Sequence, residues 1–521
     1  MSLARKYTLV GSATLASRLT GFLRDILIAA VLGSSAVADA YIAAFLLPNL
    51  FRRVLSEGAF NAAFIPIYAR RKAEAGEESV AAFTEHALSS LVAVVFLALI
   101  VAELLMPQVI GLLTPGFRDA PEKFAQAVIF GRIAFVFVAA IIVVALLASI
   151  LNAMGRYGLV AVAPLILNFM LIGVLIALIA LGWRGDYRAG LALVITVLVA
   201  GLVQLFFVAH GLRRAGAPVR LGWPQPDRDV KKLLMLMLPG LMLAGAGHFN
   251  MVVAAQLSSA LPSAVSWLYY ADRIFQLPLG FVAAAIGTVL LPEVARSFRE
   301  GNTAAAEAAG NRALEFGLLL VLPAAVSLSI LADPIVDIIY RRGAFSAADS
   351  VATAEVLRAI AIGLPGFVLV KVLLPPYLAR EHFGLPLAAA LAGIIANIAV
   401  TIALLSRLGA VAAPIGVAVS AFVNAAILAL GLKRERLFGL DATARSVLPR
   451  VIASAAVTGG VTYGLAVLLG PLLASDQAIV VRIAALGIIC ASGVAVHGLA
   501  AHWLGAADLA AIKTLIVKRT A

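Results

Sequence analysis

Charged side chains lie inside stretches of this sequence that are otherwise apolar enough to cross a membrane. The longest such stretch, from Asp39 to Arg70, carries Arg52, Arg53 and Glu57 near its middle. As one helix it would be roughly 50 Å long, against roughly 30 Å for the hydrocarbon of a bilayer, so Arg52 lies below the surface even in a tilted helix. A charge at that depth is costly, and we interpret it as lining a watery cavity inside a helix bundle.

Nine charged residues in three stretches form this intramembrane set. The set comprises Arg18, Arg24 and Asp25; Asp39, Arg52, Arg53 and Glu57; and Asp272 and Arg273. Arg18 and Asp25 share a helix face, and Arg53 can pair with Glu57 one turn later. The five cations outnumber the four anions, which predicts positive charge left over for a ligand.

Arginine rather than lysine suits a phosphate ligand, because its planar fork donates two parallel hydrogen bonds and keeps its charge when buried. We predict a pyrophosphate-bearing substrate. The predicted substrate-binding residues are Arg18, Arg24, Arg52 and Arg273, and the predicted orienting or gating residues are Asp25, Asp39, Arg53, Glu57 and Asp272. The alternative interpretation, that these charges only lock helices together as buried ion pairs, remains open.

No pattern in the sequence indicates catalysis. There is no phosphate-binding glycine loop, no Walker lysine and no nucleophile elbow. The six histidines show no metal-ligand spacing, and Cys490 is the only cysteine. We therefore expect a protein that is not an enzyme and has no metal site and no cofactor.

The composition is that of a polytopic membrane protein, with 63% hydrophobic and 13% charged residues among 521. Fourteen apolar segments predict an all-α fold of fourteen transmembrane helices. They cover residues 7–32, 36–69, 80–107, 124–151, 158–182, 188–211, 230–260, 266–295, 311–332, 350–378, 384–406, 410–432, 447–471 and 479–504. Within the second segment, Pro48 removes a backbone hydrogen bond one turn before Arg52 and predicts a kink.

The net charge of +13 is distributed by loop and does not indicate nucleic acid as a partner. Twenty-four lysines and arginines lie in the termini and the even-numbered loops, against eight in the odd-numbered loops. The positive-inside rule then predicts that both termini are cytoplasmic. No cleavable signal peptide is evident before the first span.

The two halves of the chain repeat at an offset of about 226 residues, so that Pro66 recurs as Pro292 and Gly116-Phe117 recurs near Gly343 and Phe345. We interpret this as an N-terminal lobe of six helices (1–225), a second lobe of six helices (226–440) and a two-helix C-terminal appendix (441–521). Lobes with an even number of helices have the same orientation, which predicts a central cavity between them.

The charged motifs resemble those of the MurJ (MviN) family of lipid II flippases, in the MOP exporter superfamily. The matching motifs are SRLTGFLRD (17–25), DA (39–40), LPNLFRR (47–53), EGAF (57–60) and SWLYYADR (266–273). The resemblance implies a carrier in the bacterial cytoplasmic membrane that moves the undecaprenyl-pyrophosphate-linked disaccharide-pentapeptide precursor of peptidoglycan, lipid II, to the outer leaflet by alternating access. It also implies an arginine-lined cavity, a groove for the lipid tail at the last two helices, and function as a monomer among membrane lipids.

Two departures from the family pattern concern gating and coupling. Gln276 stands where some relatives have a glutamate, and Asn397 is followed one turn later by Thr401 rather than by the carboxylate of sodium-binding members. Either a sodium ion or the membrane potential is therefore a candidate driving force. The competing functions are a drug or organic-cation antiporter, another lipid-linked oligosaccharide exporter of the superfamily, and a membrane scaffold that transports nothing.

Overall fold

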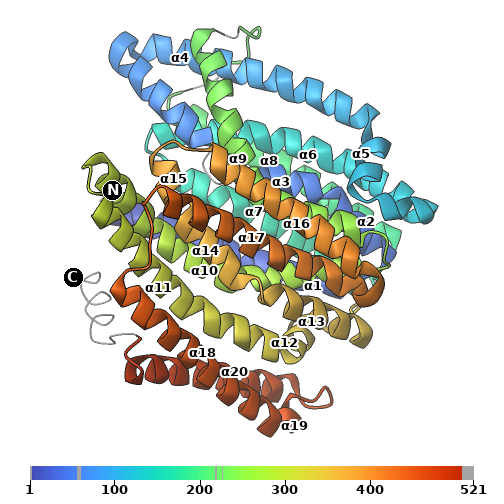
Figure 1. The fold of residues 1–521 in the computed structure, drawn as a ribbon. Helices are drawn as coiled ribbons and strands as arrows, with labels where there is room; N and C mark the ends of the chain where they lie inside the picture. The colour runs from blue at the N-terminus through green and yellow to red at the C-terminus, as the bar shows by residue number, and fades with distance from the viewer. Residues whose placement is uncertain (1–2, 55–59, 218–219, 226, 507–521) are drawn as a thin grey trace. The chain divides into compact units, whose positions relative to one another are not determined.

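The computed structural model describes residues 3–54, 60–217, 220–225 and 227–506. Every regular element in this part of the chain is a helix (Figure 1), so the predicted all-α class is confirmed. Nine helical stretches among the described residues have the length and composition to cross a membrane. The total of fourteen spans stays a prediction.

The helices group into two compact units. Unit 1 comprises Met1–Ser266 and Arg342–Ser346, and unit 2 comprises Trp267–Arg341 and Ala347–Ala521. This grouping by contacts differs from the lobes expected at 1–225, 226–440 and 441–521, which stay a prediction. Each unit is described by itself.

Unit 1 contains nine α-helices and a 3-10 turn. They are α1 (Leu3–Leu32), α2 (Ala36–Ala44), α3 (Leu46–Val54), α4 (Phe60–Leu104), α5 (Met106–Leu113), η2 (Pro115–Asp119), α6 (Pro121–Ala153), α7 (Tyr157–Ala180), α8 (Tyr187–Arg214) and α9 (Arg228–Ser258).

Pro48 divides the segment that carries Arg52 into two helices. A proline ring clashes with the carbonyl four residues earlier, which here belongs to Ala44, the last residue of α2. The Phe45 amide still donates to the Ile42 carbonyl (3.1 Å), and helical bonding resumes from Asn49 to Phe45 (2.9 Å). The predicted kink is therefore confirmed as a break, and α3 begins a fresh turn that presents Arg52.

The loop predicted at residues 70–79 is largely helical instead. Helix α4 runs through it with one non-helical residue, Gly76 (φ 74°, ψ −170°), a conformation that glycine adopts without a Cβ clash. The two arms of α4 pack against each other there, with the Phe64 and Phe83 rings stacked at 5.5 Å.

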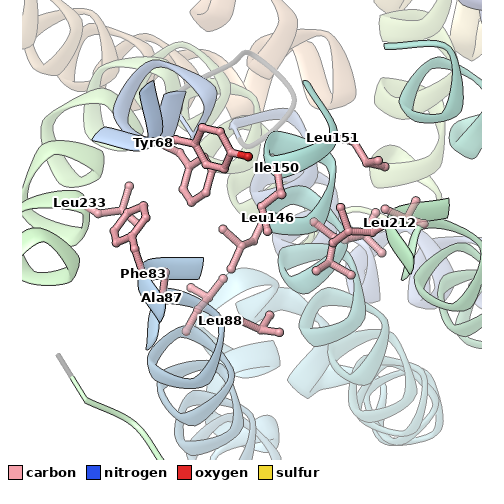
Figure 2. Packing of buried hydrophobic residues seen from close by; sticks show 14 of the residues in the cluster. Tyr68, Phe83, Ala87, Leu88, Leu146, Ile150, Leu151, Leu212 and Leu233 are labelled. Atoms are coloured by element: carbon pink, nitrogen blue, oxygen red, sulfur yellow. The ribbon is translucent and has the colours of Figure 1, made fainter. Parts of the chain in front are cut away.

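A hydrophobic core lies where α4, α6, α8 and α9 meet in unit 1 (Figure 2). Phe64, Phe83, Leu146 and Leu151 are fully buried in this cluster. Close packing of such side chains fixes these four helices relative to one another.

Helix α9 is attached to α4 by a group of ion pairs. Arg71 donates to Asp227 and to Asp229 (both 2.7 Å), and Arg70 donates to Asp229 (2.6 Å). The hydrogen bond from Arg71 is the main cause that lowers the pKa of Asp229, one residue before the predicted span. Asp227 also caps α9 by accepting from the Val230 amide (2.8 Å).

Both copies of the repeated glycine-phenylalanine sequence make close backbone contacts in unit 1. The Gly116 amide donates to Ser259 Oγ (3.1 Å), and the Ala344 amide, next to Gly343, donates to the Ala30 carbonyl (2.8 Å). A Cβ at Gly343 would lie 2.2 Å from the Ala30 oxygen, so only glycine fits there.

Unit 2 contains the remaining helices. They are α10 (Ala264–Arg299, whose first turn belongs to unit 1), α11 (Thr303–Ile330), α12 (Ala332–Tyr340), α13 (Ala347–Ala361), α14 (Leu364–Leu373), α15 (Pro375–Ala379), α16 (Gly384–Leu408), η3 (Gly409–Val411), α17 (Ala412–Arg434), α18 (Ala442–Leu468), α19 (Gly470–Leu473) and α20 (Ile479–Trp503).

The last two long helices, α18 and α20, pack together and against α11 (Figure 1). A Cβ at Gly459 of α18 would lie 2.6 Å from Val326 Cγ1 of α11. His497 of α20 joins all three helices, because its Nε2 lies 2.8 Å from the Leu319 carbonyl and its Nδ1 lies 3.2 Å from Thr458 Oγ1.

Close packing of α16 on α17 depends on Gly416. A Cβ at Gly416 would lie 2.3 Å from both Asn397 Oδ1 and Thr401 Oγ1. We expect Gly416→Ala to lower the free energy of unfolding by about 1–3 kcal/mol, because the added methyl overpacks a buried contact. Denaturant unfolding of the purified chain in detergent measures this. Gly464→Ala, whose Cβ would meet no atom within 4 Å, is the matched control, and equal destabilisation of both variants would contradict the prediction.

Candidate functional site

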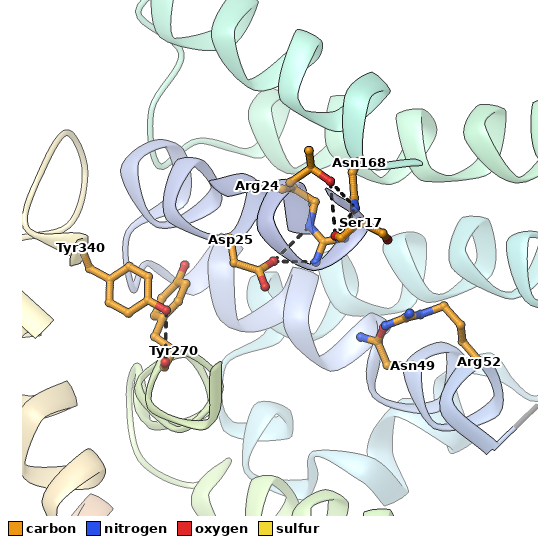
Figure 3. A network of polar contacts seen from close by, with 9 residues as sticks. Ser17, Arg24, Asp25, Asn49, Arg52, Asn168, Tyr270 and Tyr340 are labelled. Atoms are coloured by element: carbon orange, nitrogen blue, oxygen red, sulfur yellow. Dashed lines mark hydrogen bonds and ion pairs between the residues drawn. The ribbon is translucent and has the colours of Figure 1, made fainter. Parts of the chain in front are cut away.

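Arg24 is held between two polar partners inside unit 1 (Figure 3). Its Nε and Nη2 donate to Asp25 Oδ1 at 3.0 and 2.7 Å, and its Nη1 donates to Asn168 Oδ1 at 3.0 Å. The Arg24 side chain is 16% exposed and that of Asp25 is 5% exposed. Asp25 therefore balances the charge of Arg24 and fixes the plane of its guanidinium.

Asn168 connects α7 to the same face of α1. Its Nδ2 donates to the Ser17 carbonyl and to Thr20 Oγ1, each at 3.0 Å. Both hydrogen-bonding ends of its amide are thus engaged by α1. Asn168 was not predicted as a site residue, although an asparagine within a helix as apolar as α7 is itself a signal of a polar partner.

The other two predicted substrate-binding arginines of unit 1 are more accessible. Arg18 is exposed, and no carboxylate of the described chain forms an ion pair with it. Arg52 is half-buried on α3 and donates from Nη2 to Asn49 Oδ1 (3.3 Å), one turn earlier (Figure 3). The Arg53 side chain and Glu57, which we predict to pair, lie outside the described part of the structure.

Asp39 is fully buried at the centre of a separate network. Its carboxylate accepts from Lys123, from the amides of Ser263 (3.1 Å) and Ser266 (3.0 Å), and from Ser266 Oγ (2.5 Å). The Lys123 ammonium also lies 4.1 Å from the centre of the Phe117 ring. This geometry joins α2 and α6 to the first turn of α10. Lys123 was not predicted as a partner because it lies in the loop before the predicted span 124–151.

Asp272 and Arg273 lie next to each other on α10 in unit 2, and each has its own contact. Asp272 is buried and accepts a hydrogen bond from Gln276. The Arg273 guanidinium lies 4.5 Å from the centre of the Tyr269 ring, a cation–π contact that orients its plane. Gln276 therefore acts as a donor to Asp272.

The amide and hydroxyl noted for sodium coupling are fully buried in α16. Thr401 Oγ1 donates to Asn397 Oδ1 (3.0 Å). Within the described residues no three histidine, cysteine or acidic side chains gather at a spacing that would hold a metal ion. Coupling to sodium stays a prediction.

The charge balance of the predicted set in unit 1 favours an anionic ligand. Asp39 and Lys123 neutralise each other, so the described members of the predicted set that remain there are Arg18, Arg24 and Arg52 against Asp25. Guanidinium groups held by side-chain partners are suited to bind a phosphate without first reorganising.

Comparisons with known proteins identify the family of this chain. A family model described as lipid II flippase MurJ matches residues 28–476. The chain belongs to the MurJ family. Among curated MurJ relatives, a probable lipid II flippase of Rhizobium meliloti (strain 1021) is 39% identical over 98% of this chain and 96% of its own length. One from Rhizobium tropici is 37% identical over the same shares of the two chains.

Solved structures show that the MurJ fold extends over nearly the whole chain. A lipid II flippase MurJ in an inward closed conformation aligns with a TM-score of 0.78 and 22% identity, covering 95% of this chain and 98% of its own. A multidrug resistance MATE family transporter of the MOP superfamily, in an inward-facing conformation, aligns with a TM-score of 0.66 and 15% identity over 82% of this chain and 98% of its own.

The Asp39 network gives a test of its own. Lys123→Met removes the cation and leaves a buried carboxylate, so we expect it to lower the free energy of unfolding by about 3–5 kcal/mol. Adding Asp39→Asn removes the uncompensated charge, so the double variant should recover most of that loss. Denaturant unfolding in detergent measures both. If the double variant is as unstable as Lys123→Met, the ion pair does not determine the stability of this region.

Proposed function

We propose that this protein moves lipid II from the inner to the outer leaflet of the bacterial cytoplasmic membrane by alternating access, to supply cell-wall synthesis. The observation that supports this most strongly is the guanidinium of Arg24, oriented by Asp25 and Asn168 on a unit that also presents Arg18 and Arg52. A pyrophosphate diester carries two ionised phosphates, and the guanidinium groups on this unit would complement their negative charge.

The protein supplies a polar route and makes or breaks no covalent bond. An ionised pyrophosphate is prohibitively costly to move through hydrocarbon. The headgroup enters a cavity open to the cytoplasm, the arginines take the place of its water, and the lipid tail stays in the apolar phase. Arg273, oriented on Tyr269, contributes a further guanidinium, and rocking of the two halves then exposes the headgroup on the other side.

The orientation, assembly and driving force complete the proposal. Both termini are cytoplasmic, the chain acts as a monomer, and either a sodium gradient or the membrane potential supplies the energy. A membrane potential of 100 mV changes the free energy of moving one unit charge across the membrane by about 2.3 kcal/mol. The neutral Asn397–Thr401 pair favours the potential over sodium, because hard cations prefer carboxylate oxygens.

A drug antiporter is the main competing function, because a MATE transporter shares the fold. Binding organic cations requires acidic side chains to prevail at the site. Once the Asp39–Lys123 pair is set aside, the described members of the predicted set in unit 1 have the opposite balance, with three arginines against Asp25. The charge of the site therefore favours a lipid phosphate over an organic cation.

The arginines can be tested by rescue of cells depleted of their own flippase. We expect Arg24→Ala and Arg52→Ala to fail to rescue, because losing one charge-assisted contact in the transported complex weakens it about tenfold or more. Arg52→Lys should rescue partly, because it keeps the charge and loses the fork. Arg132→Ala is the control, since Arg132 is an arginine of α6 that pairs with Glu103 at 3.9 Å. Full rescue by membrane-inserted Arg24→Ala and Arg52→Ala would contradict the proposal.

Asn168 gives a separate test of orientation without a change of charge. We expect Asn168→Ala to lower the transport rate about tenfold, because the Arg24 guanidinium loses a hydrogen bond of the charged type. The measurement is the initial rate of lipid II flipping in proteoliposomes containing equal amounts of folded protein. Thr196→Ala is the matched control, because Thr196 bonds only to the Ala192 carbonyl of its own helix in the described structure. Equal rates for the two variants would exclude an orienting role for Asn168.

A further inference from the structure

A pocket of about 320 Å³ lies within unit 2, where the ends of α11, α12 and α13 meet α19 and α20. Its volume is at the lower end of the range of small-ligand pockets, about 300–1,000 Å³. None of its lining residues belongs to the arginine site described above. The polar residues that line it are Asp333, Asp337, Arg341, Ser350, Ser475 and Arg482.

The charged side chains that line this pocket are not paired one to one. Asp337 accepts hydrogen bonds from two guanidinium groups, those of Arg482 and of Arg341 (3.3 Å). The Arg482 side chain is only 9% exposed and also donates from Nε to the Leu473 carbonyl (3.2 Å). The Asp337 carboxylate therefore pairs with two guanidinium groups.

The second carboxylate of the pocket does not change this balance. Asp333 is paired with Arg358, which lies outside the lining, at 2.6 Å. The pocket and its immediate partners thus hold three guanidiniums against two carboxylates. The surplus of one positive charge matches a phosphodiester, which carries one negative charge.

Apolar side chains of the neighbouring helix ends lie open beside the pocket. Leu472, Ile479 and Val480 are 42%, 47% and 73% exposed. Ile479 and Val480 begin α20, one turn from Arg482, so charged and apolar groups meet at the level where a span enters the membrane. The positive-inside count predicts that this end of the helices faces the periplasm.

We infer that this pocket binds the headgroup of an outer-leaflet phospholipid. Arg341 donates to the phosphodiester, the Ser350 and Ser475 hydroxyls complete its hydrogen bonds, and the acyl chains lie along the exposed start of α20. Arg482 and Asp337 stay paired with each other and form one wall of the pocket. A soluble phosphate would gain nothing from the apolar border, whereas a phospholipid uses both parts of the surface.

The bound lipid has a structural consequence for unit 2. The pocket wall joins α12 to α20: Asp337 lies on α12, Arg341 follows its last residue, and Arg482 lies on α20. A headgroup between them would hold the α18–α20 pair against α12 from the membrane side. This role concerns a resident lipid and goes beyond the transport of lipid II.

The test measures how tightly the purified chain binds phosphatidylglycerol. Native mass spectrometry detects the tightest binding event. We expect Arg341→Ala to weaken this event about tenfold, the loss of one charge-assisted hydrogen bond to an anion. Ser475→Trp, which fills the pocket and keeps every charge, should weaken it to a similar extent. Arg407→Ala, a change of an exposed arginine on the same predicted side, should leave binding unchanged.

Three further ligands are compared with phosphatidylglycerol: diacylglycerol, inorganic phosphate and undecaprenyl pyrophosphate. Diacylglycerol, which lacks the phosphate, should show no dependence on Arg341 or Ser475. Equal phosphatidylglycerol binding by the unchanged chain, Arg341→Ala and Ser475→Trp would overturn the inference. So would inorganic phosphate binding as tightly as the lipid, or dependence on Arg341 confined to undecaprenyl pyrophosphate. All these are binding measurements, so failure of the transport proposal would not affect them.

Discussion

The cost of placing a guanidinium inside a membrane protein is the constraint from which the rest of this structure follows. Arg24 is retained in an apolar helix because Asp25 and Asn168 supply the hydrogen bonds that water would otherwise make. Those partners have to be positioned by packed helices, and the α1–α7 contact does this through the amide of Asn168. The Arg24 guanidinium is therefore energetically costly to bury and, at the same time, an oriented phosphate-binding group.

The same constraint divides the charged residues into two kinds. Asp39 is buried and is satisfied by the half-buried Lys123 and by serine partners, so this pair holds elements together. Arg18 and Arg52 remain accessible to a ligand to different degrees. A single count of intramembrane charges cannot separate these kinds, because an ion pair and a binding site have the same composition. Only the partner of each group separates them.

Much of the fold was predictable from hydropathy, since each predicted segment overlaps one or more helices of the structure. The break at Pro48 was predictable because proline acts on the backbone locally. The helix through residues 70–79 was not, because its charged residues are typical of a loop, and the partners of Arg71, Asp227 and Asp229, lie far along the chain. Asn168 was not predicted because sequence spacing identifies partners on one helix, whereas Asn168 bonds α7 to α1. Lys123 was not predicted because it lies one residue before the predicted span 124–151.

The most direct test of the central claim is a leaflet-accessibility assay for lipid II in vesicles that contain only this protein. The account predicts that lipid II of the inner leaflet becomes accessible outside, that an imposed membrane potential changes the rate, and that Arg24→Ala abolishes the exchange. Exchange that proceeds equally with and without the Arg24 guanidinium, or no exchange by the folded protein under a sodium gradient or a potential, would contradict it.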